Sequence, residues 1–169
     1  MNKRIKILFV LFICLNVMCQ EPIKPDWKDL NYAGNEQGYH TMDIYLPKKN
    51  KKKYPVVMTI YGSAWGRNDK KGANKIKKES LIKSGFAVVS INHRSSYDAI
   101  FPAQIHDVKA AIRFIRGNAK KFKIDTSFFG ITGISSGGHL ACLAGTTSFN
   151  KSMEGNLGKF LNFSSHVDA

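Results

Sequence analysis

Residues 133–137, Gly-Ile-Ser-Ser-Gly, contain the pattern G-x-S-x-G. In this pattern a strand turns sharply into a helix and leaves the middle serine exposed at the tip of the turn. The two glycines allow neighbouring backbone to pack where a Cβ would clash. The N–H groups at the start of the helix then face negative charge that develops on a reacting carbonyl oxygen. The pattern therefore predicts a nucleophilic serine.

The spacing of the glycines decides between two adjacent serines. Ser136 would need glycine in place of Ile134, so we assign the nucleophile to Ser135 and expect Ser136 to contribute its backbone N–H to an oxyanion hole. The alternative interpretation is a glycine-rich strand–helix turn in which serine only caps the helix. His139 follows four residues after Ser135, and we expect its ring to point along the helix away from the turn.

Alternating strands and helices must position this turn. The residues predict strands over 40–47, 54–62, 86–92 and 128–133, and helices over about 70–84, 101–122 and 135–147. The first strand alternates apolar and polar residues, which is typical of a strand near an edge, whereas the others are continuous apolar runs. This order predicts an α/β fold whose sheet is mostly parallel with helices on both faces.

Residues 1–19 have the pattern of a secretory signal peptide. Basic residues precede an apolar run over 7–18, and Val17 and Cys19 occupy the −3 and −1 positions of a cleavage site. We expect a secreted or periplasmic protein with no stable membrane insertion after cleavage. A lipid anchor on Cys19 is the alternative, which the bulky Met18 disfavours. Residues 20–39 are polar, contain two prolines and predict an extended lead-in.

The chain is strongly basic, with a formal net charge of +14. Without residues 1–19 it has 23 basic and 12 acidic residues, a net charge of +11. Two lysine clusters, over 47–55 and 69–78, lack the interleaved aromatic residues of a single-strand nucleic-acid binder. We therefore expect solvated surfaces and no nucleic-acid partner, with attraction to an acidic polysaccharide or the cell envelope as the alternative. Outside residues 1–19 the one cysteine is Cys142, which we expect to be buried.

Several further segments resemble one family. Residues 61–65, Tyr-Gly-Ser-Ala-Trp, are similar to the His-Gly-Gly-Gly-Trp segment of α/β hydrolases, in the bacterial esterase/lipase branch that includes polysaccharide-associated acetyl and feruloyl esterases. The similarity continues through the segments 91–96, 101–119, 124–141 and 153–169. It covers about residues 40–169, which we interpret as the N-terminal part of an α/β-hydrolase domain.

The resemblance implies a serine carboxylic-ester hydrolase that works through an acyl-enzyme, without metal or cofactor, on small or polysaccharide-linked acetyl or feruloyl esters. By the same resemblance, the N–H groups of Ser63 and Ser136 form the oxyanion hole, with Ala64 as a further candidate. Trp65 lines the acyl or alcohol side of the pocket, or else packs as a core indole. We expect Arg94 and Asp107 to form a structural ion pair between a strand end and a helix.

A serine hydrolase of this fold also needs a carboxylate and then a histidine after the serine. Glu154 and His166 are the only pair in that order, but the family places both partners on loops after later strands. His40, His93 and His106 precede the serine and match no family base. We therefore expect a truncated domain that lacks its C-terminal part and is inactive alone. A hydrolase-like binding module and a serine exopeptidase of the same fold are the alternatives.

Overall fold

The structure is a computed structural model that describes residues 23–67, 69–72 and 75–169; the expected signal peptide and Cys19 lie outside these ranges. Its elements in chain order are β1 (Trp27–Asn31), η1 (Gly38–His40), β2 (Thr41–Tyr45), β3 (Tyr54–Ile60), α2 (Lys75–Lys83), β4 (Ala87–Ile91), α3 (Ala103–Gly117), β5 (Ile124–Gly133), α4 (Ser136–Thr146) and α5 (Lys151–Glu154). No helix in these described ranges is long and apolar enough to cross a membrane.

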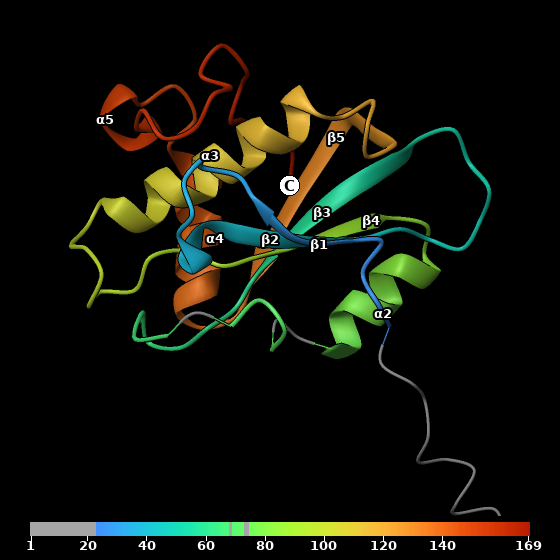
Figure 1. Cartoon of the computed structure of the whole chain (residues 1–169), viewed down its shortest axis with the longest axis horizontal. Helices are drawn as coiled ribbons and strands as arrows, with labels where there is room; N and C mark the ends of the chain where they lie inside the picture. The colour runs from blue at the N-terminus through green and yellow to red at the C-terminus, as the bar shows by residue number, and fades with distance from the viewer. Residues whose placement is uncertain (1–22, 68, 73–74) are drawn as a thin grey trace, which may run out of the picture.

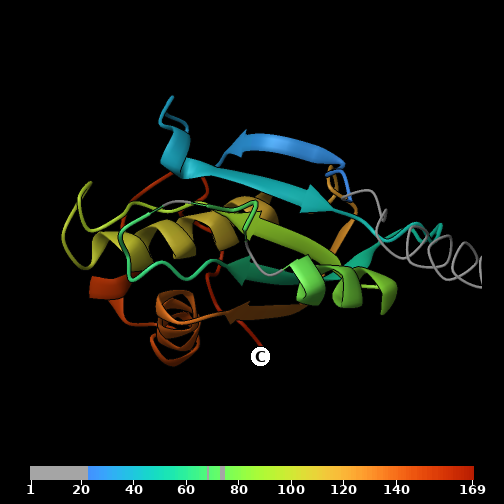
Figure 2. The same cartoon turned by 90° about the horizontal axis from the view of Figure 1, so that it is seen from below.

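The strands form one sheet in the order β1-β2-β4-β3-β5. Figure 2 shows them side by side, with β1 at one edge and β5 at the other. β3 is parallel to both β4 and β5, whereas β2 is antiparallel to β1 and β4. The predicted α/β class is confirmed, and the described sheet is mixed rather than mostly parallel because β1 and β2 form an antiparallel hairpin on one side.

Each central strand is buried on both faces. In β3, Val56 and Met58 belong to the main core with α3 and α4, while Val57 between them is buried on the opposite side of the pleat. In β4, Val88 packs with Ile82 of α2 in a second, smaller cluster. Figure 1 shows α3 above the sheet and α2 below it. This double burial explains why the strands are continuous apolar runs.

Helix α3 is the main cover of the core. The apolar face predicted from the 3.6-residue period is confirmed, since every residue of that stripe is buried to at least 99%: Ile105, Val108, Ala111, Ile112 and Ile115. The helix packs against α4, so the serine turn that begins α4 rests on a rigid layer.

Three sequence expectations differ from the structure. The lead-in over 20–39 contains a strand, β1, which takes the edge position expected for 40–47; its register shift between Trp27 and Leu30 hides the alternation that marks a strand. Helix α2 begins at Lys75 rather than near 70. Cys142 is exposed, because α4 directs Ala141 and Ala144 into the core and Cys142 away from it.

We expect Phe129→Ala to destabilise the fold by about 4 kcal/mol, because its ring is fully buried in the core and truncation leaves a cavity. Urea unfolding followed by circular dichroism measures the change. Phe149→Ala is the matched control, since this ring is 87% exposed and its loss should change stability by less than about 0.5 kcal/mol. Equal losses in the two variants would contradict the assignment of the core.

Candidate active site

The turn between β5 and α4 holds Ser135 in a strained conformation. β5 ends at Gly133 and α4 begins at Ser136, so only Ile134 and Ser135 make the turn. Ser135 has φ 53° and ψ −124°, a region that residues with a Cβ rarely adopt and that costs about 1–3 kcal/mol. Its side chain is exposed, and its Oγ forms no hydrogen bond with any residue that the structure describes. The strand–turn–helix context predicted for residues 133–137 is confirmed.

This turn lies in direct backbone contact with the end of β3. A Cβ on Gly137 would lie 2.4 Å from the carbonyl oxygen of Ile60. In the reverse direction, a Cβ on Gly62 would lie 2.1 Å from the carbonyl oxygen of Ile134. Both distances are far inside van der Waals contact, so only glycine fits at either position without movement of the backbone. The two glycines bring the segment 61–65 against the serine turn.

A hydrogen bond between the two segments differs from our expectation. The N–H of Ser63, which we expected in the oxyanion hole, donates to the Oγ of Ser136 at 3.0 Å. Ser136 is buried, so its hydroxyl requires a partner inside the protein, and Ser63 supplies it. The backbone N–H groups of Ser136 and Ala64 donate to no described residue. Both N–H groups are therefore open donors on the two contacting segments.

Residues 64 and 65 form a second strained turn. Ala64 has φ 49° and Trp65 has φ 60°, so both lie in the left-handed region although neither is glycine. The structure places Trp65 39% exposed at the edge of a pocket rather than inside the core. The alternative, that Trp65 packs as an indole inside the core, is therefore wrong.

The pocket beside this turn has a volume of about 290 Å³ and mostly apolar walls. Its lining residues come from three segments near the carboxyl ends of the strands: Trp65, Ser96, Phe101, Gln104, His139 and Leu140. The ring of His139 stands edge-on to Trp65 with 5.6 Å between centroids. His139 therefore forms part of the pocket wall, a role that the sequence analysis did not assign to it.

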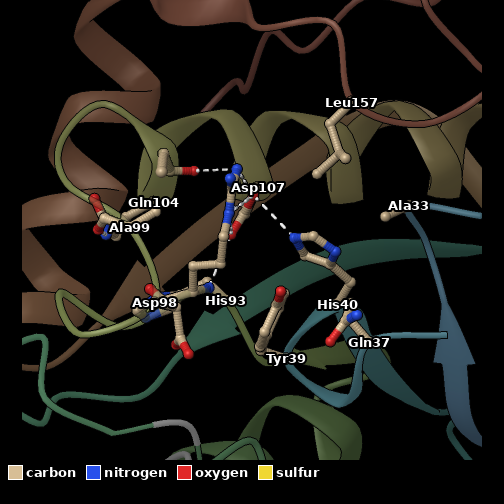
Figure 3. A network of polar contacts seen from close by, with 12 residues as sticks. Ala33, Gln37, Tyr39, His40, His93, Asp98, Ala99, Gln104, Asp107 and Leu157 are labelled. Atoms are coloured by element: carbon tan, nitrogen blue, oxygen red, sulfur yellow. Dashed lines mark hydrogen bonds and ion pairs between the residues drawn. The ribbon is translucent and has the colours of Figure 1, made fainter. Parts of the chain in front are cut away.

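The predicted pair between Arg94 and Asp107 is confirmed. Arg94 donates to both carboxylate oxygens of Asp107, through its backbone N–H at 2.8 Å and through Nη2 at 2.5 Å. Figure 3 shows His40 on the other side of the fully buried carboxylate. His40 Nε2 lies 3.3 Å from Asp107 Oδ1, close enough for electrostatic attraction but not aligned as a hydrogen bond. Burial raises the pKa of Asp107, but these partners outweigh it and the pKa is lowered.

This network supports the segment that carries the pocket. Ser95 follows the anchored Arg94, and its carbonyl accepts a hydrogen bond from Gln104 Nε2 at 3.3 Å. The N–H of Ser96 then donates to the carbonyl of Trp65 at 2.8 Å. A continuous series of contacts therefore leads from Asp107 through the β4–α3 connection to the strained turn at Trp65.

All the histidines lie in the described part of the chain, and none contacts Ser135 through a hydrogen bond in it. His93 is buried with Nδ1 2.7 Å from the carbonyl of Arg94, and burial lowers its pKa. His106 Nε2 lies 2.9 Å from the carbonyl of Ser152. His166 Nδ1 lies 3.0 Å from Ser148 Oγ. None of these histidines is therefore hydrogen-bonded to Ser135 as a general base would be.

Glu154 does not support His166, so the only pair in the family order is not a catalytic pair. Its carboxylate instead binds Lys109 at 2.6 Å and Arg113 at 3.1 Å, two buried cations of α3. Sequence reasoning missed this cluster, and the signal was there: two basic residues interrupt an otherwise apolar helix face at a spacing of four. No group of three His, Cys, Asp or Glu in the described ranges could hold a metal ion.

Residues 42–169 match the family model BD-FAE. The chain belongs to the BD-FAE family. This confirms the resemblance to α/β-hydrolase esterases, because the relatives and solved structures that it matches include esterases and a carbohydrate esterase. The match includes the serine turn and the segment 61–65, whereas β1 lies outside it.

Esterase LipQ of Mycobacterium tuberculosis is 35% identical over 100 residues, which cover 59% of this chain and 24% of that protein. A bifunctional GH43-CE protein of Bacteroides eggerthii has a solved structure with a TM-score of 0.83 and 57% identity, covering 84% of this chain and 20% of that one. A truncated carbohydrate esterase from gut microbiota gives a TM-score of 0.84 and 49% identity, covering 89% and 56%. This BD-FAE chain thus spans about a quarter of the length of LipQ.

We expect Gly137→Ala to destabilise the protein by about 3 kcal/mol, although alanine favours a helix by about 1 kcal/mol. The reason is the 2.4 Å approach of its Cβ to the Ile60 carbonyl, which forces the turn away from β3. Denaturant unfolding measures this change. Gly38→Ala is the control, since its Cβ meets nothing within 4 Å and stability should hold. If Gly137→Ala left the free energy of unfolding unchanged, the two segments would not be in contact.

We expect Asp107→Asn to destabilise the fold by about 3 kcal/mol near neutral pH, because it leaves Arg94 without its carboxylate. The folded pKa of Asp107 lies below 3.8, so its stabilisation is present above that value and is lost as pH falls through the lower folded pKa. Thermal melts from pH 7 to pH 2 should therefore show less acid sensitivity in Asp107→Asn. Glu36→Gln, at an exposed carboxylate, should melt like the parent chain.

Proposed function

We propose that Ser135 is the nucleophile of a carboxylic-ester hydrolase. The observation that carries the proposal is its exposed, unbonded Oγ on a strained turn beside the open N–H groups of Ser136 and Ala64. Such a turn exposes the serine oxygen to substrate while the N–H groups face the position of a developing oxyanion. A turn that only connected β5 to α4 would not require the strained backbone conformation of Ser135.

In the proposed reaction, Ser135 Oγ attacks the carbonyl carbon of the ester while its proton passes to a general base. The tetrahedral intermediate collapses, the bond to the alcohol oxygen breaks, and the alcohol leaves with a proton. Water then hydrolyses the acyl-enzyme, and Ser135 regains its proton. The N–H groups of Ser136 and Ala64 hold the oxyanion, and that of Ser63 joins them if Ser136 Oγ releases it.

We propose that the base and its carboxylate come from outside residues 1–169. The contacts of the histidines support this, since His40, His93, His106 and His166 each lie against another group and His139 packs on Trp65. On this proposal the 169-residue chain has the nucleophile and the oxyanion donors, but it hydrolyses esters slowly or not at all.

The proposed substrates are acetyl or feruloyl esters on small molecules or polysaccharides. The two solved structures at 57% and 49% identity, with "CE" and "carbohydrate esterase" in their descriptions, support a carbohydrate-linked ester. The apolar walls of Trp65, Phe101 and Leu140 suit an acyl group better than a sugar. We further propose that the protein is exported, on the basis of residues 1–19.

The experiment locates the reactive serine with a fluorophosphonate probe and peptide mass spectrometry. We expect slow labelling at Ser135 that free imidazole accelerates, because imidazole replaces the absent base. Ser135→Ala should abolish this labelling. The matched control is Ser148→Ala, which removes the serine that contacts His166 and should leave the labelling rate unchanged.

Label at Ser148 instead of Ser135 would contradict the nucleophile assignment. Rapid hydrolysis of p-nitrophenyl acetate by the full chain, lost in Ser135→Ala and independent of imidazole, would place the base within residues 1–169. No labelling of any serine would favour a hydrolase-like binding module.

A further inference from the structure

One edge of the sheet carries an unusual concentration of positive charge. We call it the amino edge, by which we mean the end of the sheet where β3, β4 and β5 begin and β2 ends, and not one of its outer strands. The β2–β3 connection places five exposed lysines there, at 48, 49, 51, 52 and 53. The α3–β5 connection adds exposed lysines at 120, 121 and 123. Backbone contact joins the two connections, since the N–H of Tyr54 donates to the carbonyl of Lys123 at 2.9 Å.

Acidic side chains offset little of the positive charge of these ammonium groups. No salt bridge joins any of the eight lysines to a carboxylate among the described residues. Asp26 accepts from the N–H of Leu46. Asp125 accepts from the N–H of Ser127, and this hydrogen bond, with a smaller contribution from the charge of Lys53, lowers the pKa of Asp125. In contrast, the buried cations Lys109 and Arg113 share one carboxylate of Glu154. The positive charge of the amino edge therefore faces solvent.

The amino edge lies opposite the serine turn. β5 starts at Ile124 on this edge and ends at Gly133 beside Ser135; because it pairs over this length with the seven residues of β3, about 20 Å separate its two ends. The described chain also starts on this edge, because Trp27 pairs with Ile44 near the end of β2. Figure 1 shows the β2–β3 and α3–β5 connections at the same end of the sheet, away from the start of α4.

We propose that the amino edge docks on a membrane surface rich in anionic phospholipids. Several lysines on flexible stems attract an array of lipid phosphates, each contributing about 1 kcal/mol near the surface. Docking in this orientation leaves Ser135 on the opposite edge, accessible to substrate.

An acidic polysaccharide fits the same edge less well. The exposed lysines are not accompanied by an exposed aromatic platform, since Tyr54 and Phe122 within the two connections are buried. A polysaccharide held here would also need to extend at least about 20 Å around the molecule to present an ester to Ser135. Docking on lipid needs neither feature and does not depend on the proposed esterase reaction.

The test is flotation of the full chain with lipid vesicles at low salt. We expect binding to vesicles of phosphatidylcholine mixed with phosphatidylglycerol and far less to phosphatidylcholine alone. The triple variant Lys51→Gln, Lys52→Gln and Lys53→Gln should bind the mixed vesicles about a hundredfold more weakly. Salt at about 1 M, where screening acts within about 3 Å, should release the parent chain.

The matched control changes the same number of charges away from the amino edge, through Lys71→Gln, Lys151→Gln and Lys159→Gln, all at exposed positions. It should retain most of the binding, and melting curves verify that both variants fold. An equal loss of vesicle binding in the control would overturn the proposal, because binding would then depend on the net charge of the protein and not on the position of the lysines. So would equal binding to neutral vesicles, or tighter binding to soluble polygalacturonate than to mixed vesicles.

Discussion

The contact between two backbone turns is the constraint on which the candidate site depends. The end of β3 and the turn after β5 touch through main-chain atoms, with Gly137 against Ile60 and Gly62 against Ile134. No side chain fits between them, so the two segments hold a fixed relation. That relation holds the segment with the open N–H of Ala64 against the turn that carries Ser135 and Ser136, and Ser135 itself stays in a strained conformation. Packing of α4 on α3 and on the sheet must compensate for this strain.

Polar groups extend this constraint into the rest of the molecule. Asp107 is buried on α3, where an unpaired carboxylate would be costly, and it is tolerated because Arg94 and His40 surround it. The same pair fixes the β4–α3 connection, whose Ser96 N–H reaches the carbonyl of Trp65. The pocket wall is thus held by an ion pair and hydrogen bonds from a helix, while the serine turn is held by backbone contact from a strand.

The two edges of the sheet differ in chemistry. The carboxyl edge has strained turns, an apolar pocket and open N–H groups, all near Ser135. The amino edge has short connections with exposed lysines and no comparable strain apart from Lys123 at φ 55°. Parallel strands produce this separation, because every strand of β3, β4 and β5 begins at one edge and ends at the other. Loops at the amino edge are therefore free to accumulate charge without disturbing the site.

Hydrophobic period and glycine spacing are local properties, so the residues alone predict the α/β class, the buried strands, the apolar face of α3 and the turn that carries Ser135. The sequence did not reveal β1, because its bulge breaks the alternation of apolar and polar residues. It also did not reveal that Glu154 forms ion pairs with the two buried cations of α3. The hydrogen bond from Ser63 N–H to Ser136 Oγ and the packing of His139 against Trp65 are seen in the folded chain and not in the sequence. These contacts join residues far apart in the chain, so their geometry follows from packing rather than from any local pattern.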